Sequence, residues 1–482
     1  MILKEIIQGL NFSRIIGDDN IVIRGLSQNS NEIKQGYVFF AKKGYSTDGH
    51  QFIPEAIEKG CRVVVCEYLP QNIDNNITYI LSHDVPEVMG EMAHRFYGRP
   101  SEKLQVIGVT GTNGKTTTST LLYQLFCATG IPAGLISTVK IIIDKQTIPA
   151  KLTTPDSISL HRTLKDMVDH GCKYCFMEVS SIGVDQKRIQ GIRFKGGIFT
   201  NITHDHLDYH KTFENYLKAK QLFFTQLSEE AFALYNADDK NGKIMVQNSR
   251  AKKYSYAVKS PADFTCKIID NTKDGLILRI NQHEIHTRLA GRYNAYNLLA
   301  TYATAILCGI EEWEAVKHLS NIRAAEGRFE IIRGKNNITG IVDYAHTPDA
   351  LKNILDNLNE LKQKGRIITV VGCGGNRDKE KRPLMGKIAA KLSDQAIFTS
   401  DNPRDENPAD IIENMMSDLD PVNKKKVIVI EDRKQAIKTA VTLAQPGDIV
   451  LVAGKGHEDY QEIKGKRFPF NDSEILQNML NE

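Results

Sequence analysis

One stretch of the chain combines glycine, lysine and threonine in a way that can hold a phosphate. Residues 106–122 read VIGVTGTNGKTTTSTLL, with glycines spaced G-T-N-G-K-T rather than as in the common G-x-x-x-x-G-K-[ST] loop. An apolar run of strand length precedes the loop, and leucines at helical spacing follow it. Such a turn directs backbone N–H groups and a helix N-terminus at one point. Lys115 adds positive charge and Thr116 a hydroxyl for Mg²⁺, so the loop predicts a nucleotide but no particular reaction.

Acidic residues and histidines follow two further strand-like runs. Glu178 ends the run CFME, where a carboxylate beside a phosphate loop can bind Mg²⁺; a solvated strand-end acid is the common alternative. The segment TNITHDHLDYH (residues 200–210) packs Asp205, His206, Asp208 and His210 into six residues. For Asp208 and His210 we expect capping and surface hydrogen bonds, whereas cation binding is an equal alternative for His206.

Composition restricts the classes of protein. The 482 residues suggest about three domains at roughly 150 residues each. A net charge of +4, without a basic arm, argues against nucleic acid as a partner. The N-terminus is too interrupted by charge for a signal peptide, and no run is long enough to span a membrane. Eight cysteines without regular spacing indicate reduced thiols in the cytoplasm, and Cys172 and Cys175 are expected to be buried structural thiols.

Alternating strand-like and helical runs predict an α/β protein with parallel sheets. Five strand-like runs after residue 334 are separated by helical patterns such as PDALKNILDNLNELKQKG. Ligands bind beyond the carboxyl ends of such strands, where GCGGNRD, SDNPRDE and AGKGHED lie. We expect domain boundaries that give segments 1–99, 100–328 and 329–482.

Ten motifs, in order, give the chain a family resemblance over nearly its whole length: GTNGKTT, MEVSS, TNITHDHLDYH, YLKAKQLF, NAYN, GRFE, DYAHTPDAL, GCGGNRD, DNPR and GKGHE. The chain resembles the Mur ligase family, ATP-dependent amide-forming enzymes of peptidoglycan synthesis. It is most similar to the members that add the third residue to UDP-MurNAc-L-Ala-D-Glu. The resemblance implies an N-terminal UDP-MurNAc-binding α/β domain, a central P-loop ATPase-like parallel-sheet domain and a C-terminal Rossmann-like domain that binds the amino acid.

The resemblance also implies a reaction and an ATP site. The substrate carboxylate takes the γ-phosphoryl group of ATP, and an amine attacks the resulting acyl phosphate. The phosphate loop would hold the triphosphate, adenine would lie near an asparagine pair, and further groups would reach the phosphates as the C-terminal domain closes. The implied ATP-binding residues are Gly111, Thr112, Asn113, Gly114, Lys115, Thr116, Thr117, Asn294, Asn297, Arg328, Asp343 and His346.

Two Mg²⁺ sites follow from the same resemblance, and with Lys115 their ligands make up the implied catalytic set. Thr116 and Glu178 would hold one ion, and Glu178, His206 and Lys220 the other. An ammonium cannot bind a cation, but the lysine of Y-x-x-A-K in the family is carbamylated by CO₂, and Lys220 stands at that position. Without the resemblance, Lys220 would be a surface lysine of a helix, as we expect for Lys218.

Two further sets of residues match substrate-binding positions of the family. For the UDP-sugar peptide they are Ser30, Tyr45, Ser46, Thr47, Thr153, Thr154, Ser180, Gln186 and Arg188. For meso-diaminopimelate they are Arg377, Asp401, Asn402, Pro403, Arg404, Gly454 and Glu458. Family members that use diaminopimelate carry D-N-P-R, because the arginine can grip the distal carboxylate that lysine lacks. Glu458 could receive a substrate ammonium. We expect a cytoplasmic monomer.

Three departures from the family pattern leave alternatives open. Asn29 and Asn31 flank Ser30 where D-S-R is usual, Ile182 replaces a usual histidine, and Asn376 replaces a usual aspartate. The enzyme alternatives are a lysine-adding Mur ligase and a polyglutamate-forming folate ligase. The remaining alternatives are a P-loop ATPase that drives a conformational change and an inactive protein that binds a UDP precursor.

Overall fold

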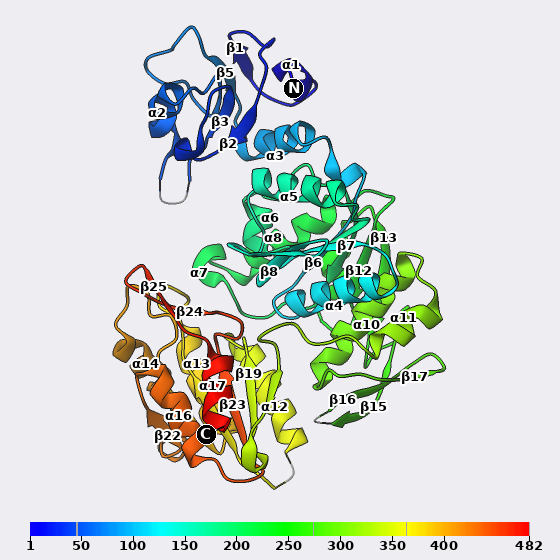
Figure 1. Cartoon of the computed structure of the whole chain (residues 1–482), viewed down its shortest axis with the longest axis vertical. Helices are drawn as coiled ribbons and strands as arrows, with labels where there is room; N and C mark the ends of the chain where they lie inside the picture. Colours follow the sequence, from blue (N-terminus) through cyan, green and yellow to red (C-terminus); the bar gives the residue numbers. More distant parts are fainter. Residues whose placement is uncertain (45–46, 273, 363, 482) are drawn as a thin grey trace.

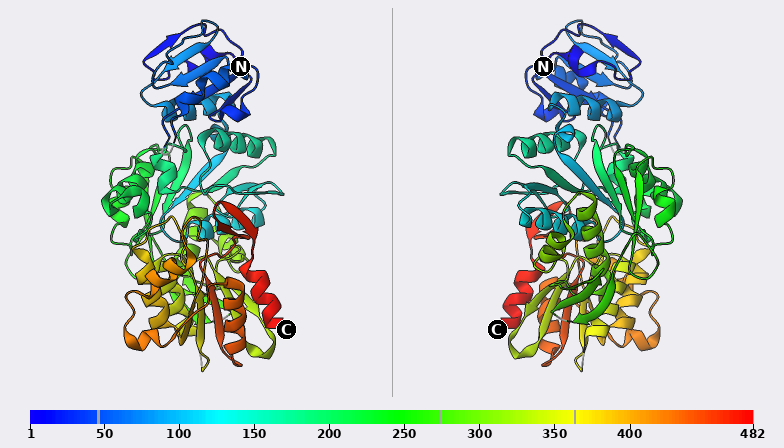
Figure 2. Two further views of the ribbon diagram at one scale, coloured as in Figure 1. Left: turned by 90° about the vertical axis from the view of Figure 1, so that its left-hand side faces the viewer. Right: turned by 90° about the vertical axis from the view of Figure 1, so that its right-hand side faces the viewer.

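The chain forms three α/β units arranged along one long axis, with the N-terminal and C-terminal units at opposite ends (Figures 1 and 2). This computed structural model describes residues 1–44, 47–272, 274–362 and 364–481. The three-domain α/β architecture expected from the sequence is therefore confirmed. None of the helices within these ranges is both long and apolar enough to cross a membrane.

The N-terminal unit is built on a five-stranded sheet, parallel except for its β1 edge. The strand order is β1 (Arg14–Ile16), β5 (Thr78–Leu81), β4 (Val63–Cys66), β3 (Tyr37–Ala41) and β2 (Gly25–Ser27). Its helices are α1 (Leu3–Ile7), α2 (Ile53–Glu58) and α3 (Val85–Phe96), with η1 (Ser30–Glu32) and η2 (Gly49–Phe52). Beyond α2 the chain turns at Gly60, whose φ of +97° suits glycine.

The central unit holds the phosphate loop in the middle of a nine-stranded sheet. The strand order is β14 (Phe264–Thr265), β13 (Lys252–Ala257), β12 (Phe232–Asn236), β11 (Phe194–Phe199), β6 (Gln105–Thr110), β10 (Tyr174–Glu178), β7 (Ala133–Ile136), β8 (Lys140–Ile143) and β9 (Gln146–Pro149). All neighbours pair in parallel up to β7, and β8 and β9 form an antiparallel extension that the sequence did not indicate. Strand β6 carries the loop and lies between β10 and β11, so residues that end all three strands meet at one edge.

Helices cover this sheet and join it to its neighbours. They are α4 (Lys115–Ala128), α5 (Ser157–Asp169), α6 (Ser181–Asp185), α7 (Leu207–His210), α8 (Phe213–Thr225), α9 (Gly242–Val246), α10 (Arg292–Leu307) and α11 (Glu312–Leu319). Helix α3 of the N-terminal unit packs against α5, and η3 (Pro100–Glu102) connects the two units (Figure 1). A small antiparallel sheet, β15 (Lys267–Thr272), β16 (Gly275–Ile280) and β17 (His283–His286), packs near α10 and α11. As expected, Cys172 and Cys175 are buried, free thiols.

The C-terminal unit contains the five strands that the sequence predicts. Its sheet order is β18 (Glu330–Arg333), β19 (Thr339–Asp343), β23 (Ile449–Ala453), β20 (Ile367–Val371), β21 (Gln395–Phe398) and β22 (Val427–Val429), parallel except for β18. Its helices are α12 (Pro348–Leu361), α13 (Lys381–Leu392), α14 (Pro408–Met416), α15 (Pro421–Lys424), α16 (Arg433–Leu443) and α17 (Asp472–Asn481), with η4 (Lys335–Asn337). A separate hairpin, β24 (Tyr460–Ile463) and β25 (Lys466–Pro469), follows β23.

A fully buried ion pair ties α16 and α17 to the carboxyl ends of two strands. Arg433 at the start of α16 donates to both carboxylate oxygens of Asp472, at 2.8 and 2.7 Å. The same guanidinium donates to the carbonyls of Ser400, at 3.4 Å, and Ala453, at 3.0 Å. These carbonyls lie just before the DNPR and GKGHE segments, so the Arg433–Asp472 ion pair fixes the backbone at the carboxyl ends of β21 and β23.

We expect Arg433→Leu to destabilise the C-terminal unit by about 3–5 kcal/mol, because it leaves the carboxylate of Asp472 buried without its cation. Urea denaturation would show the transition of that unit at lower denaturant. Lys218→Ala removes the exposed pair with Glu214 and serves as the control, with an unchanged transition. Equal midpoints for the Arg433 variant and the wild type would show that the pair is not needed for stability.

Candidate active site

The phosphate loop has the strand–turn–helix form that the sequence predicts. Strand β6 ends at Thr110 and α4 begins at Lys115. Gly111 and Gly114 have φ values of +155° and +88°, which suit glycine. The Lys115 ammonium folds back over the loop and donates to the carbonyls of Gly111 and Thr112, both at 2.9 Å. A side chain at Gly111 would have its Cβ 1.9 Å from Oγ1 of Thr200, so the turn closes only on glycine.

The segment after β11 packs directly on this loop. The Asn113 N–H donates to Oδ1 of Asn201 at 2.9 Å, and the Thr203 N–H donates to Oγ1 of Thr112 at 3.0 Å. The Thr112 hydroxyl also bonds to the Tyr216 hydroxyl of α8 at 2.9 Å. These bonds bring the TNITHDH segment and α8 to the phosphate loop, although they are far apart in the sequence.

Lys220 is buried in α8, so the surface alternative for this residue is wrong. Only 1% of the residue is exposed, and its Nζ donates to the Gly111 carbonyl at 2.9 Å. The Nζ also lies 4.7 Å from the ring centre of Tyr216. Burial, and then the nearby Lys115 cation, hold the pKa of Lys220 well below its usual value. The lysine is therefore suited to be a neutral amine, whereas Lys218 is exposed and paired with Glu214 as expected.

Glu178, Thr116 and His206 lie around the two lysines. The Glu178 carboxylate is fully buried and accepts hydrogen bonds from the backbone N–H and hydroxyl of Thr138, at 2.7 and 3.1 Å. Burial lowers the pKa of Lys115, against the opposing charges of Glu178 and Asp205. Burial likewise lowers the pKa of His206 to about 4, so its imidazole is neutral at neutral pH and free to act as a ligand.

This donor set fits Mg²⁺ only in part. The Thr116 hydroxyl and the Glu178 carboxylate are oxygen donors, which Mg²⁺ prefers. His206 has a φ of +55°, a strained conformation that places it at the start of α7. Lys220 offers no ligand as an ammonium and only a nitrogen donor as an amine, whereas a carbamate on its Nζ would supply the oxygen that Mg²⁺ prefers. Asp208 is exposed as expected, but His210 is buried and bonds to the Ser181 hydroxyl at 2.9 Å, so the surface role expected for it is wrong.

Most residues expected to hold the UDP-sugar peptide form one network beside Glu178. The Thr154 hydroxyl bonds to the Glu178 carbonyl at 3.0 Å and to the Ser180 hydroxyl at 3.1 Å. Arg188 donates to the Thr154 carbonyl at 2.8 Å and to Oε1 of Gln186 at 2.7 Å. The hydroxyls of Thr153 and Thr138 are hydrogen-bonded to each other at 3.0 Å.

The N-terminal members of that set lie in a different unit. The Ser30 hydroxyl donates to Glu55 at 2.9 Å within the N-terminal unit. Thr47 lies at the end of the loop after β3, and Tyr45 and Ser46 fall outside the described residues. The Ser30 contact is internal to its unit, and the UDP-binding role of these residues stays a prediction.

The residues expected near adenine and the phosphates link the central unit to the C-terminal unit. Asn294 and Asn297 are buried and bond to each other at 2.9 Å, with Oδ1 of Asn297 3.4 Å from the Thr118 hydroxyl. Arg328 donates at 3.1 Å to the hydroxyl of Thr116, which lies in the first turn of α4 just after the phosphate loop. Asp343 accepts from the N–H groups of Phe329 and Ala345, at 2.7 and 2.8 Å, which fixes the strand end that carries His346.

The expected diaminopimelate residues converge at the carboxyl edge of the C-terminal sheet. A Cβ at Gly374 would lie 3.0 Å from Nη1 of Arg404 and 3.8 Å from Cγ of Arg377, so the Arg404 guanidinium and the stem of Arg377 both pass close to this glycine. Asp401, Asn402 and Pro403 are buried, and Gly454 has a φ of +117° with Asp401 close by. Oε2 of Glu458 accepts from Asn402 at 2.7 Å and from Lys455 at 3.2 Å. Burial raises the pKa of Glu458, and the Asp401 charge adds to the effect.

Two of the three departures have a local physical explanation. Asn376 has a φ of +52°, which asparagine tolerates well, and its Nδ2 donates to Asp405 at 2.7 Å, a bond that an aspartate could not donate. Asn29 caps η1 by accepting from the Asn31 N–H, while Oδ1 of Asn31 accepts from Lys59 at 3.0 Å. Nothing in the structure explains Ile182.

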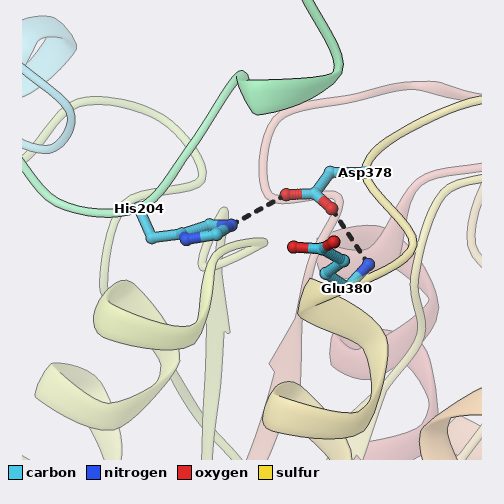
Figure 3. A group of neighbouring side chains, drawn as sticks. All are labelled: His204, Asp378 and Glu380. Carbon is cyan, nitrogen blue, oxygen red and sulfur yellow. Dashed lines mark hydrogen bonds and ion pairs between the residues drawn. The ribbon is translucent and has the colours of Figure 1, made fainter. Parts of the chain in front are cut away.

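Polar contacts join the phosphate-loop region to the C-terminal unit. Asn113 of the loop donates to Asp349 at the start of α12, at 3.0 Å. His204 lies 3.0 Å from Oδ2 of Asp378, and Glu380 lies beside this pair (Figure 3). The Glu380 backbone N–H donates to Asp378 at 2.9 Å, so the aspartate already has a donor on each side. We therefore interpret this trio as a hydrogen-bonded contact between units.

Two residues beside the expected site residues were not identified from the sequence, Thr138 in the central unit and Lys455 in the C-terminal unit. Thr138 orients the Glu178 carboxylate, and it follows β7 by two residues, so the strand-end rule could have identified it. Lys455 is fully buried and bonds to both Asn402 and Glu458, at 3.1 and 3.2 Å. Lys455 lies inside the GKGHE motif, but lysine side chains are usually exposed to solvent, and only the fold shows that this one is buried.

Models of known families match most of the chain. Residues 22–97 match the model described as Mur ligase family, catalytic domain, and residues 109–305 match the Mur ligase middle domain. Residues 327–456 match the Mur ligase, glutamate ligase domain.

Full-length relatives and a solved structure agree with these matches. The chain is 53% identical over 480 residues to UDP-N-acetylmuramoyl-L-alanyl-D-glutamate--2,6-diaminopimelate ligase of Phocaeicola vulgatus, covering 99% of each chain. It is 51% identical over 481 residues to the protein of the same name from Cytophaga hutchinsonii, covering 100% of this chain and 99% of that one. A solved structure of a ligase with this name shares 30% identity and a TM-score of 0.70, covering 100% of this chain and 98% of the other.

We expect Gly111→Ala to abolish nucleotide binding, because the added Cβ would lie 1.9 Å from Oγ1 of Thr200 and force the phosphate loop open. Fluorescent-nucleotide titration should show an affinity at least about 100-fold weaker, since several backbone N–H donors are lost together. Gly130→Ala is the matched control. It also carries a positive φ, of +82°, but its Cβ would meet no atom within 4 Å, so nucleotide affinity should persist. Wild-type affinity in the Gly111 variant would contradict the proposed geometry of the loop.

Proposed function

The chain belongs to the Mur ligase family, and from this we propose that it joins meso-diaminopimelate to the D-Glu carboxylate of UDP-MurNAc-L-Ala-D-Glu at the expense of ATP. The reaction is a step of peptidoglycan precursor synthesis. Beyond the family, the observation that carries the proposal is the buried Lys220 amine, which shares the Gly111 carbonyl with the phosphate-loop lysine. The combined HDH and Y-x-x-A-K sites argue against a P-loop ATPase that only drives a conformational change.

The chemistry needs ATP because a carboxylate is a poor electrophile. In the proposed reaction the D-Glu carboxylate oxygen attacks the γ-phosphorus, and ADP leaves. The amine of diaminopimelate then attacks the acyl carbon, loses a proton, and displaces phosphate as the amide forms. Lys115 and the loop N–H groups would hold the triphosphate, and Arg328, in the segment that leads into the C-terminal unit, would add positive charge. Closure of the two units around the acyl phosphate would keep water away from it.

Lys220 would act as a carbamate. Its neutral amine attacks CO₂, forms a C–N bond and releases one proton, so a buried amine becomes an anion. Burial favours the neutral amine that this step needs, and the nearby Lys115 cation stabilises the anion that results. When Mg²⁺ is bound it neutralises phosphate charge, and Thr116, Glu178, His206 and the carbamate of Lys220 would hold it.

Arg404 would select the amino acid. Diaminopimelate differs from lysine by a distal carboxylate, and a guanidinium can grip a carboxylate through two parallel hydrogen bonds. Glu458, Asn402 and Arg377 would contact other parts of the same amino acid. We place the enzyme in the cytoplasm as a monomer, consistent with eight free cysteines and a substrate set that includes ATP.

The first test is phosphate release with Mg²⁺-ATP and UDP-MurNAc-L-Ala-D-Glu, in parallel reactions with meso-diaminopimelate, L-lysine or no amino acid. We expect release with diaminopimelate, and at least about 10-fold less with lysine because one charged hydrogen-bond pair is lost. Release with lysine alone would contradict the role of Arg404 but not the ligase. Equal release in all three reactions would favour an uncoupled ATPase.

Lys220→Ala should lower kcat by about 10²–10³-fold, because it removes the carbamate oxygens that would help hold the Mg²⁺ that neutralises phosphate charge. Short carboxylic acids such as acetate should partly restore the rate by occupying the vacated space. Lys218→Ala, two residues away and exposed, is the control and should retain wild-type turnover. A Lys220 variant that loses activity but is not rescued, in an enzyme whose intact mass shows no added CO₂, would argue against the carbamate.

A further inference from the structure

The hairpin β24–β25 is hydrogen-bonded along the DNPR segment rather than to the main sheet. The Gln461 amide donates to the Asp401 carbonyl at 2.7 Å, and the Glu462 N–H donates to Oδ1 of Asn402 at 2.9 Å. The Arg404 N–H donates to the Glu462 carbonyl at 3.0 Å, and its carbonyl accepts from Lys464 at 2.7 Å. Strand β24 therefore fixes Arg404, whose φ of +51° is a strained conformation for a long side chain.

The Arg404 guanidinium lies between two acceptors. Its Nη1 donates to the Gly375 carbonyl at 2.8 Å, and its Nε lies 3.6 Å from Oε2 of Glu462. The side chains of Arg404 and Glu462 remain 21% and 25% exposed, so both charges are within reach of a ligand. Within the described parts of the chain, the Glu462 carboxylate has no other ion pair or side-chain hydrogen bond.

We propose that Glu462 binds the distal ammonium of meso-diaminopimelate while Arg404 binds the distal carboxylate. This inference rests on the proposed function. The distal carbon of this amino acid carries one ammonium and one carboxylate, and the Glu462–Arg404 pair presents one charge of each opposite sign, 3.6 Å apart. A pair that reads two substituents of one carbon also fixes the configuration of that carbon, which a single arginine cannot do.

Glu458 is less suited to this ammonium. Its Oε2 already accepts from Asn402 and from Lys455, whose cation is fully buried beside it. Binding an ammonium there would place a second cation against Lys455. Glu462 lies 3.6 Å from the Arg404 cation and opposite Arg467 across the hairpin, whose guanidinium packs on the Tyr460 ring at 4.2 Å. The Arg404 guanidinium would be neutralised by the substrate carboxylate when both groups are bound.

The test compares two amino acids with wild type and Glu462→Gln. The first is meso-diaminopimelate, and the second is L-2-aminoheptanedioate, which keeps the distal carboxylate but lacks the distal ammonium. In the wild type, kcat/KM for meso-diaminopimelate should exceed that for the analogue by about 10–100-fold, the value of one charged hydrogen bond. Glu462→Gln should lower kcat/KM for meso-diaminopimelate by a similar factor, mainly through KM, and leave the analogue within about 3-fold.

The controls separate recognition from structure. Glu413→Gln, on an exposed position of α14, should leave both substrates unchanged. KM for ATP and the thermal midpoint should be unchanged in Glu462→Gln. An equal loss for both substrates would show that Glu462 only orients Arg404, and a gain for meso-diaminopimelate would show that it competes with the substrate; either result overturns the inference. No phosphate release by the wild type with meso-diaminopimelate would instead overturn the proposed function, and this inference with it.

Discussion

Two lysine ammonium groups cannot share one buried carbonyl at little cost, and this constraint organises the centre of the molecule. Lys115 and Lys220 both donate to the Gly111 carbonyl at 2.9 Å, and burial lowers the pKa of each. Like charges so close in a poorly solvated site repel strongly. The arrangement becomes favourable when one lysine is neutral or negative and when anionic phosphates face the other. With both lysines protonated, the site therefore carries unbalanced positive charge, which bound phosphates or a negative group on one lysine would offset.

Several loops of the site have strained backbone. His206, Phe329 and Arg404 all have positive φ values, between +50° and +55°, and all lie in loops of the site. Such conformations persist only where neighbouring bonds impose them. For Arg404 those bonds come from β24, and for Phe329 one comes from the Asp343 carboxylate. Hydrogen bonds from the neighbouring strands thus hold these loops in backbone conformations that they would not adopt alone.

The sequence predicted the α/β class, the parallel strands of the C-terminal unit and the strand–loop–helix at Gly111, because local periodicity and glycine placement decide them. It did not indicate β8, β9 or the small sheet β15–β17, since short antiparallel edge strands have weak patterns. Residue type alone indicated a surface position for Lys220 and suggested solvent for Lys455, and both are buried. Burial of a lysine depends on what packs over it, which comes from segments far away in the sequence. The role of Thr138 likewise appears only when β7 and β10 are placed side by side.

The joint between the central and C-terminal units includes several polar contacts, and some of them lie where nucleotide is proposed to bind. Arg328 donates to the Thr116 hydroxyl, and Asn113 donates to Asp349. A triphosphate in the loop would offer Arg328 a full negative charge in place of a neutral hydroxyl, and charged hydrogen bonds are the stronger kind. Polar interfaces of this sort also permit movement between domains more readily than apolar ones. Occupation of the loop would therefore change how the C-terminal unit is held, and the unit that carries Arg404 would respond to the nucleotide bound at Lys115.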